Sequence, residues 1–309
     1  MKNKKLKILL TTITIILLGS VFAANHLYNV ALNVNTKTSV REQDVEKDIE
    51  DTKYEENYEW LKKQNVKERK IKSVLNKDIY AYELRNKEAN KWIITVHGYS
   101  RNGHAMATFI RHFYDLGYNV LFPDLLGHGK SKNDFYTMGS YDSKDLAKWV
   151  KLISSENKES KIILFGVSMG AATVLNSLDE NLTKNVVAFI EDSGYISLDK
   201  LYTYQLKKNY KLSKFPLLNL ASTITKIRAG FYFKDVDAKK ALEDNKIPGL
   251  FLHGEKDTFV PIDNLNEMIK YGNFKKEVHT FKDVKHVKAY FVYEKEYWDI
   301  ISKFLKKVE

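Results

Sequence analysis

The sequence predicts an α/β protein in which helices flank a mostly parallel central sheet. Short apolar runs rich in β-forming residues, such as 92–96, 118–123 and 162–165, alternate with helical stretches, a pattern typical of parallel sheets. The chain has 309 residues, of which 44% are hydrophobic, so it can bury one large core. The run 161–172 carries the pattern G-x-S-x-G between a strand and an Ala-rich helix, and the other elements can be arranged around it.

Ser168 stands at the centre of this pattern. A G-x-S-x-G turn holds its serine in a strained backbone conformation at the carboxyl edge of a sheet, and Gly166 and Gly170 let the strand and the helix approach each other. The next amide, that of Met169, lies at a helix N-terminus, where free donors and the helix dipole stabilise a developing oxyanion. We therefore expect Ser168 to be a nucleophile and the Met169 amide to be one donor of an oxyanion hole.

Composition excludes several classes of protein and site. The formal net charge is +11, but the lysines are scattered among acids and aromatic residues and no nucleic-acid motif organises them. We expect a solvated basic surface with some attraction to anionic lipid, and no nucleic-acid partner. The chain has no cysteine, which excludes a disulfide framework, a thiol nucleophile, a Cys-ligated metal and a lipid-modified cysteine.

The amino terminus predicts export. The uncharged apolar stretch 8–24 would form a helix about 25 Å long at ~1.5 Å per residue, enough for an uncleaved anchor in a thin bilayer. The run 21–23 also offers a small-residue site for signal peptidase, so residues 1–25 are a signal peptide or a signal anchor. By the positive-inside rule the rest of the chain lies outside the cytoplasm, either at the membrane or secreted. The basic residues that precede the stretch are Lys2, Lys4, Lys5 and Lys7.

Two segments precede the parallel strands. Residues 26–65 are polar, with an acid-rich section at 44–59, and read as a stalk or a surface helix without chemistry. Residues 66–84 alternate between apolar and polar around a turn at 76–78, which predicts an antiparallel hairpin at the sheet edge. We expect the catalytic domain to extend over 66–309.

Further motifs follow the first two parallel strands. Residues 97–99 are His-Gly-Tyr, and residues 124–131 have the pattern D-x-x-G-H-G-x-S. Together with G-x-S-x-G they resemble the α/β-hydrolase family, from about residue 67 to the carboxyl end. The resemblance implies the α/β-hydrolase fold, structural roles for His97 and His128, and a second oxyanion donor in the amide of Tyr99. It does not select among esterases, lipases, thioesterases, peptidases and acyltransferases.

The catalytic acid is expected after the nucleophile, because triads of this family follow the order Ser, acid, His. The run 253–261, H-G-x-x-D-x-x-V-P, resembles the acid-bearing loop of the family, with Asp257 as the carboxylate. Glu255 and Asp192 are rivals, and Asp192 also follows a strand directly. We choose Asp257, for which the alternative is a turn or helix-capping aspartate.

His286 is the predicted general base. It lies downstream of the acid in the loop after the last predicted strand, 276–281, where the resemblance places this residue. The family often has Gly before this histidine, whereas this chain has Lys285. Aromatic and apolar residues at helical spacing over 289–305 then predict a closing helix on the sheet.

A small helical cap is expected at about 196–246, where the chain is longer than a simple crossover helix and rich in aromatic residues. In the family, insertions here cover the nucleophile and shape the substrate pocket; alternatively, these aromatics only pack the insertion on the body. The runs 191–195 and 225–230 resemble a group of exported, membrane-associated bacterial hydrolases, similar to serine aminopeptidases and esterases.

These observations predict a serine hydrolase that cleaves a carboxylic ester of a small or lipid-like acyl substrate. His286 would take the Ser168 proton, Asp257 would stabilise the imidazolium, and the Met169 and Tyr99 amides would bind the oxyanion. No metal or organic cofactor is implied, and the membrane is contacted through the amino-terminal segment. Two alternatives remain: a serine peptidase or acyltransferase with the same triad, and an envelope protein that uses the fold only for binding.

Overall fold

One sheet of eight strands forms the centre of the molecule. The computed structural model describes residues 2–36, 52–86 and 90–308. The strand order is β1-β2-β4-β3-β5-β6-β7-β8; β1 and β2 pair antiparallel, as do β2 and β4, and every later pair is parallel. The α/β class and the mostly parallel sheet expected from the sequence are confirmed. The strands are β1 (Lys67–Lys72), β2 (Asp78–Leu84), β3 (Lys91–Val96), β4 (Asn119–Pro123), β5 (Lys161–Val167), β6 (Val186–Asp192), β7 (Gly249–Gly254) and β8 (Lys276–Phe281).

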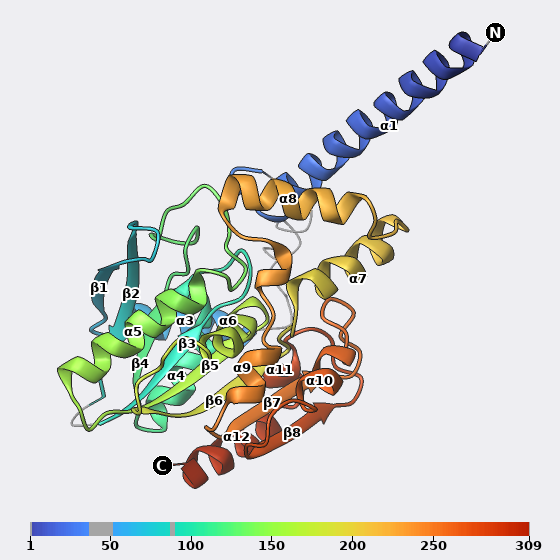
Figure 1. Ribbon diagram of the computed structural model, residues 1–309. Coiled ribbons are helices and arrows are strands. Elements are labelled where there is room, and N and C mark those ends of the chain that lie inside the picture. Colours follow the sequence, from blue (N-terminus) through green and yellow to red (C-terminus); the bar gives the residue numbers. More distant parts are fainter. Residues whose placement is uncertain (1, 37–51, 87–89, 309) are drawn as a thin grey trace.

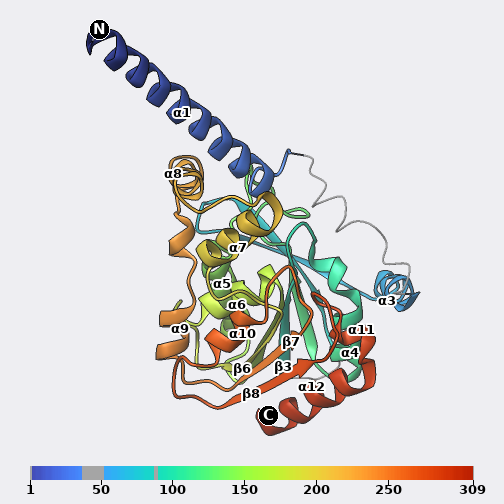
Figure 2. The same cartoon turned by 90° about the vertical axis from the view of Figure 1, so that its right-hand side faces the viewer.

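Helices cover both faces of the sheet (Figures 1 and 2). On one face α4 (Ala107–Asp115) and α12 (Glu294–Val308) bury an aromatic cluster that includes Phe113, Phe165 and Phe304. On the other face lie α5 (Asp142–Glu156), α6 (Met169–Ser177), α9 (Lys239–Asp244) and α10 (Asp263–Met268), whose apolar sides join the larger core. The predicted closing helix is divided into α11 (Ala289–Val292) and α12.

The register brings the ends of the parallel strands to one edge. Val96 of β3 pairs with Gly166 of β5, and Val167 of β5 pairs with Asp192 of β6. The loops after these strands, and after β7 and β8, therefore meet at the carboxyl edge, where open α/β sheets place their ligand sites.

The insertion between β6 and β7 contains α7 (Leu198–Tyr210), α8 (Leu217–Ala229) and a short helix, η2 (Phe233–Asp235), ahead of α9. Several of its aromatics pack within the insertion or on the body: Tyr202 lies 4.9 Å from Phe233, and Phe231 lies 5.9 Å from Tyr141, between ring centroids. These side chains therefore pack the insertion together and onto the body, which was the alternative to a role in shaping the substrate pocket. That the insertion serves as a cap stays a prediction.

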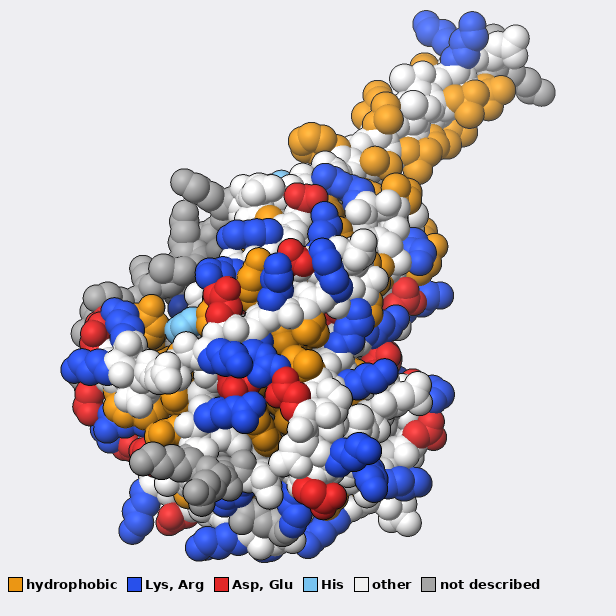
Figure 3. All heavy atoms as spheres, turned by 90° about the vertical axis from the view of Figure 1, so that its left-hand side faces the viewer, with side chains coloured by type: hydrophobic (Ala, Val, Ile, Leu, Met, Phe, Trp, Pro, Cys, Tyr) orange, Lys and Arg blue, Asp and Glu red, His pale blue; other side chains and the backbone are white. Residues whose placement is uncertain are grey.

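The amino-terminal helix α1 (Lys2–Ala31) is longer than expected and is part of the domain at its carboxyl end. Its first two thirds project from the domain and expose apolar side chains, with lysines near the tip (Figures 1 and 3). Within the described residues it is the one helix long and apolar enough to cross a membrane, a property that signal sequences share. Ala24, Tyr28 and Leu32 are buried.

This packing differs from the predicted boundary at residue 25 and from a stalk that begins at 26. The buried positions 24, 28 and 32 recur every four residues and form one apolar stripe, which holds the end of α1 on the domain. Of the remaining stretch, 37–51 lies outside the described residues. The part from 52 onward forms α3 (Thr52–Lys62), whose Leu61 is buried in the core under α4.

Candidate active site

Ser168 occupies a sharp turn between β5 and α6. Its backbone has φ 54° and ψ −119°, a region that residues with a side chain rarely adopt. A Cβ on Gly170 would lie 2.1 Å from the Val96 carbonyl oxygen, and a Cβ on Gly166 would lie 2.4 Å from the Gly170 carbonyl oxygen. Glycine is therefore required at both flanks, which explains why this pattern builds a turn that presents the serine at the sheet edge.

Three of the predicted residues form one hydrogen-bonded chain. Ser168 Oγ lies 2.8 Å from His286 Nε2, and His286 Nδ1 lies 2.6 Å from Asp257 Oδ2. In the neutral tautomer that this arrangement favours, Nδ1–H donates to the carboxylate and Nε2 accepts from the serine hydroxyl. The residues come from three separate loops at the carboxyl edge, after β5, β7 and β8.

Asp257 is held by its own loop. Its Oδ1 accepts hydrogen bonds of 2.8 Å from the amides of Phe259 and Val260, which leaves Oδ2 directed at His286. The residue is 5% exposed. The two amides therefore fix the position of the carboxylate beside the imidazole.

His253 supports this loop and was not predicted to take part. Its Nε2 lies 2.8 Å from the Val260 carbonyl oxygen and 3.5 Å from Asp257 Oδ2. Burial lowers the pKa of His253, so the neutral ring donates Nε2–H to the carbonyl. The sequence feature that could have indicated this supporting role is the position of His253 in the H-G-x-x-D run, one residue before the end of β7.

The rival carboxylates bind other groups. Asp192 is fully buried, accepts from Ser193 Oγ and Tyr297 Oη at 2.8 Å each, and has its pKa raised by burial to about 6. Glu191 accepts from the Gly194 amide at 2.9 Å, and burial raises its pKa to about 8.

The other predicted rival, Glu255, accepts a hydrogen bond of 2.8 Å from Thr280 Oγ1 near the surface, whereas Glu191 was not among the rivals. Among the described residues, Asp257 is thus the carboxylate that is hydrogen-bonded to His286.

The predicted oxyanion donors lie on both sides of Ser168. Met169 is the first residue of α6, so its amide is among those without an acceptor inside the helix. A Cβ on Gly98 would lie 3.5 Å from the Ser168 Cβ, so the loop that carries Tyr99 passes directly against the nucleophile. The role of both amides stays a prediction.

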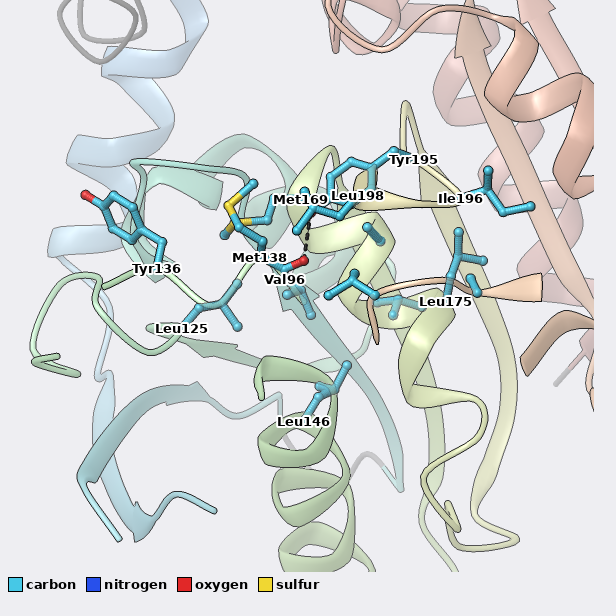
Figure 4. Close-up of a cluster of buried hydrophobic side chains, with 14 of the residues drawn as sticks. Val96, Leu125, Tyr136, Met138, Leu146, Met169, Leu175, Tyr195, Ile196 and Leu198 are labelled. Carbon is cyan, nitrogen blue, oxygen red and sulfur yellow. Dashed lines mark hydrogen bonds between the residues drawn. The ribbon is translucent and has the colours of Figure 1, made fainter. Parts of the chain in front are cut away.

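The side chains of these two residues fix their backbones. Met169 is buried in the core beside Met138 (Figure 4). The carbonyl oxygen of Met138 accepts a hydrogen bond of 2.8 Å from Tyr195 Oη. Tyr99 packs edge-on against Tyr136, at 5.0 Å between ring centroids, and its hydroxyl donates to a backbone carbonyl of α1. Both amides are therefore part of well-packed structure.

His97 and His128 have the structural surroundings that the resemblance implied. Burial lowers the pKa of His97 to about 4, and its neutral Nε2 accepts from the Leu125 amide at 3.0 Å. The His97 ring lies 4.8 Å from that of His128, between ring centroids. Asp124 accepts from the Gly103 amide at 2.8 Å and thereby fixes the same turn.

Comparisons with known proteins find similar hydrolases. The sequence profile of the serine aminopeptidase S33 family matches residues 87–230. YqkD of Bacillus subtilis is 27% identical over 236 residues, which cover 76% of this chain and 77% of YqkD. The AB hydrolase superfamily protein YisY of the same organism is 26% identical over an alignment that covers 63% of this chain and 84% of YisY.

Solved structures agree with this finding. The esterase Pf2001 of Pyrococcus furiosus superposes with a TM-score of 0.64 at 26% identity, and the superposition covers 79% of this chain and 92% of the Pf2001 chain. An esterase of Exiguobacterium antarcticum, at 16% identity and a TM-score of 0.55, shares the fold over 77% of this chain and 98% of its own. The sheet order and the serine turn show the α/β-hydrolase fold, and these likenesses support an α/β-hydrolase family and with it hydrolase activity.

Proposed function

We propose that the protein is a serine hydrolase that cleaves carboxylic esters through a covalent acyl-enzyme, with its catalytic domain outside the cytoplasmic membrane. The observation that supports this most directly is the chain of hydrogen bonds from Ser168 Oγ through His286 to Asp257, at 2.8 and 2.6 Å. Nucleophile, base and orienting acid within hydrogen-bond reach are the geometry of an activated serine.

The reaction has two matched halves. Ser168 Oγ bonds to the ester carbonyl carbon while His286 Nε2 takes its proton, and Asp257 stabilises the imidazolium. The Met169 and Tyr99 amides donate to the oxyanion, and loss of one such donor costs on the order of 3 kcal/mol of transition-state stabilisation. His286 then protonates the leaving alkoxide. Water repeats the sequence on the acyl-enzyme and releases the carboxylic acid.

Ester cleavage is favoured over aminopeptidase activity by the charges around the site. A peptidase that binds a free amino group needs an accessible carboxylate, but Glu191 and Asp192 are fully buried. The exposed Glu255 is already hydrogen-bonded to Thr280. Lys208 of α7 donates to the carbonyl oxygen of Thr258, beside Asp257, so a cation already lies next to the acid loop. The aminopeptidase name of the matching family profile keeps peptide cleavage as the second candidate.

The location rests on α1. Residues 8–22 expose apolar side chains on a helix preceded by lysines, as an anchor with a cytoplasmic amino end would. The helix continues through residues 21–23 into the buried Ala24, and packed helices are poor protease substrates. Both facts favour an uncleaved anchor over a secreted form.

Labelling of the purified full-length protein with a fluorophosphonate probe tests the nucleophile without knowledge of the substrate. We expect labelling of the wild type that is lost in Ser168→Ala and His286→Ala, while the matched control His279→Ala retains it. Absence of labelling in folded wild type would contradict the mechanism. A panel of acyl esters and aminoacyl amides then separates the two candidates, and we expect faster turnover of the esters.

A further inference from the structure

The helices α7 and α8 carry an exposed apolar and basic surface. Phe215 and Ile227 are 77% and 79% exposed, and Tyr210 and Leu212 are also exposed. Ile227 lies on the outward face of α8, one turn beyond the exposed Thr223. We call this surface the α7–α8 rim; its members are Lys207, Lys208, Tyr210, Lys211, Leu212, Phe215, Lys226 and Ile227.

All charged side chains of the rim are lysines, so the rim is positively charged. Two lysines of the surrounding segment have carboxylate partners: Lys200 with Glu267 at 2.5 Å, and Lys214 with Asp199. Within the described part of the chain, the four lysines of the rim form no ion pair with a carboxylate. The segment 200–234 contains no Asp or Glu and eight basic residues, namely Lys200, Lys207, Lys208, Lys211, Lys214, Lys226, Arg228 and Lys234.

The rim lies where α1 leaves the domain. Arg228 of α8 donates to Asn25 Oδ1 of α1 at 2.9 Å, and its guanidinium lies 4.3 Å from the centre of the Tyr28 ring. In two perpendicular views, α8 lies on the side of the domain from which the projecting part of α1 emerges (Figures 1 and 2). The rim therefore faces the same side as the apolar helix.

Helix length fixes how close the membrane must be. The exposed apolar stretch 8–22, which follows Lys7, is about 22 Å long at ~1.5 Å per residue, less than the roughly 30 Å of a hydrocarbon core. Ala24, two residues later in the same continuous helix, is already buried by the domain. No flexible linker separates the two, so a helix that spans the bilayer holds the domain against its surface.

We propose that the α7–α8 rim docks on the anionic surface of the membrane that α1 spans. Phe215 and Ile227 enter the interfacial layer, and the rim lysines lie among lipid phosphates. This inference rests on the proposed membrane anchor and goes beyond the proposed reaction.

Weak contacts suffice for this docking. Each Lys near an anionic surface contributes about 1 kcal/mol, and apolar side chains add their buried area. The anchor keeps the rim at a high effective concentration beside the lipid, so little further affinity is needed. An anionic lipid surface fits the rim better than a second copy of this chain, because two rims of the same positive sign repel each other.

Single-cysteine variants of the full-length chain test the docking, since the protein has no cysteine of its own. The protein is reconstituted into phosphatidylglycerol vesicles, labelled with a fluorophore and quenched with nitroxide lipids. We expect strong quenching at Leu212→Cys and Thr223→Cys in the rim region and at Leu17→Cys in α1. The control Val292→Cys, which is exposed on α11 far from α8, is expected to stay unquenched.

A charge variant tests the lipid specificity. Neutralising three rim lysines should weaken docking on the order of 100-fold at about 1 kcal/mol per charge, whereas the same change on α12 should have no effect. Replacing phosphatidylglycerol by phosphatidylcholine should act like the rim variant. The rim variant is Lys207→Gln/Lys211→Gln/Lys226→Gln, which leaves Lys208 and its contact with Thr258 in place, and the control is Lys295→Gln/Lys303→Gln/Lys306→Gln.

The outcomes separate the two proposals. Quenching at position 17 without quenching at 212 and 223 would overturn the docking and leave the anchor intact. Absence of quenching at all three would overturn the anchor itself. Quenching that ignores lipid charge would refute the electrostatic contact, and rim contacts that depend on protein concentration instead of lipid would identify a second copy as the occupant.

Discussion

Glu191 makes the stability of the fold depend on pH in a way that one substitution can test. The carboxyl lies at the end of β6 with no exposed surface, its Oε2 accepts from the Gly194 amide at 2.9 Å, and its Oε1 has no hydrogen-bond partner among the described residues. Burial, which disfavours the charged form, raises the pKa of Glu191 from 4.5 to about 8. At neutral pH the folded protein therefore holds this proton, whereas the unfolded chain has released it.

The sign and the size of the effect follow from this difference. Between pH 4.5 and about 8 the folded state binds more protons than the unfolded state, so the free energy of unfolding falls as the pH rises. Each pKa unit corresponds to about 1.4 kcal/mol, so the full loss is on the order of 5 kcal/mol. It is absent below pH 4.5 and complete above about pH 8.

Glu191→Gln keeps the shape and the acceptor for the Gly194 amide but cannot ionise. We expect the decline between pH 5 and 8 to be shallower in this variant, with the remaining decline below about pH 7, where Asp145 and Asp192 also release protons. The variant should be more stable than the wild type at pH 8. Urea unfolding followed by tryptophan fluorescence at five pH values measures this, with the exposed Glu159→Gln as control. A variant whose unfolding free energy falls with pH as steeply as that of the wild type would refute the reasoning.

Two further substitutions probe the supports of the site. Tyr297→Phe removes the hydroxyl that donates to Asp192 Oδ2 at 2.8 Å. We expect the free energy of unfolding to fall by about 1–3 kcal/mol in urea unfolding, because a buried acceptor loses its donor. A fall of less than about 0.5 kcal/mol would contradict this expectation. Gly170→Ala would place a Cβ 2.1 Å from the Val96 carbonyl oxygen, so we expect limited proteolysis to find little folded protein. The control Gly19→Ala has open space around its Cβ and should fold normally. Equal yields of folded protein from the two variants would contradict the close approach at Gly170.

The elements around the site could be predicted because the required signals are local. A buried strand, a Gly-flanked serine and a helical stretch lie within one short run, and the turn around Ser168 has the strained backbone that this pattern requires. The order of the motifs also selected Asp257 and His286, which the structure brings together with Ser168. Their roles in catalysis stay predictions until labelling tests them.

The contacts between distant segments could not be predicted in this way. Arg228 lies about 200 residues beyond Asn25, and nothing in either local sequence specifies the pairing. The hydrogen bond from Tyr297, far along the chain in α12, to Asp192 inside the core likewise could not be predicted. The spacing of Ala24, four residues before Tyr28, was the one available sign that α1 continues as a packed helix.

The end of α1 connects the membrane side of the molecule with the candidate site. Ala24 is buried where the projecting helix meets the domain, and Ala31, two turns later, accepts a hydrogen bond of 2.8 Å from Tyr99 Oη. The Tyr99 amide is the predicted second oxyanion donor, so the backbone of this predicted donor is held in place partly by α1. A chain cut after residue 31 would lose this contact and also the docking of α8 on α1, which extends over both turns. The proposed membrane anchor and the geometry of the candidate site are therefore linked through one short helical segment, and full-length protein is the form in which activity should be measured.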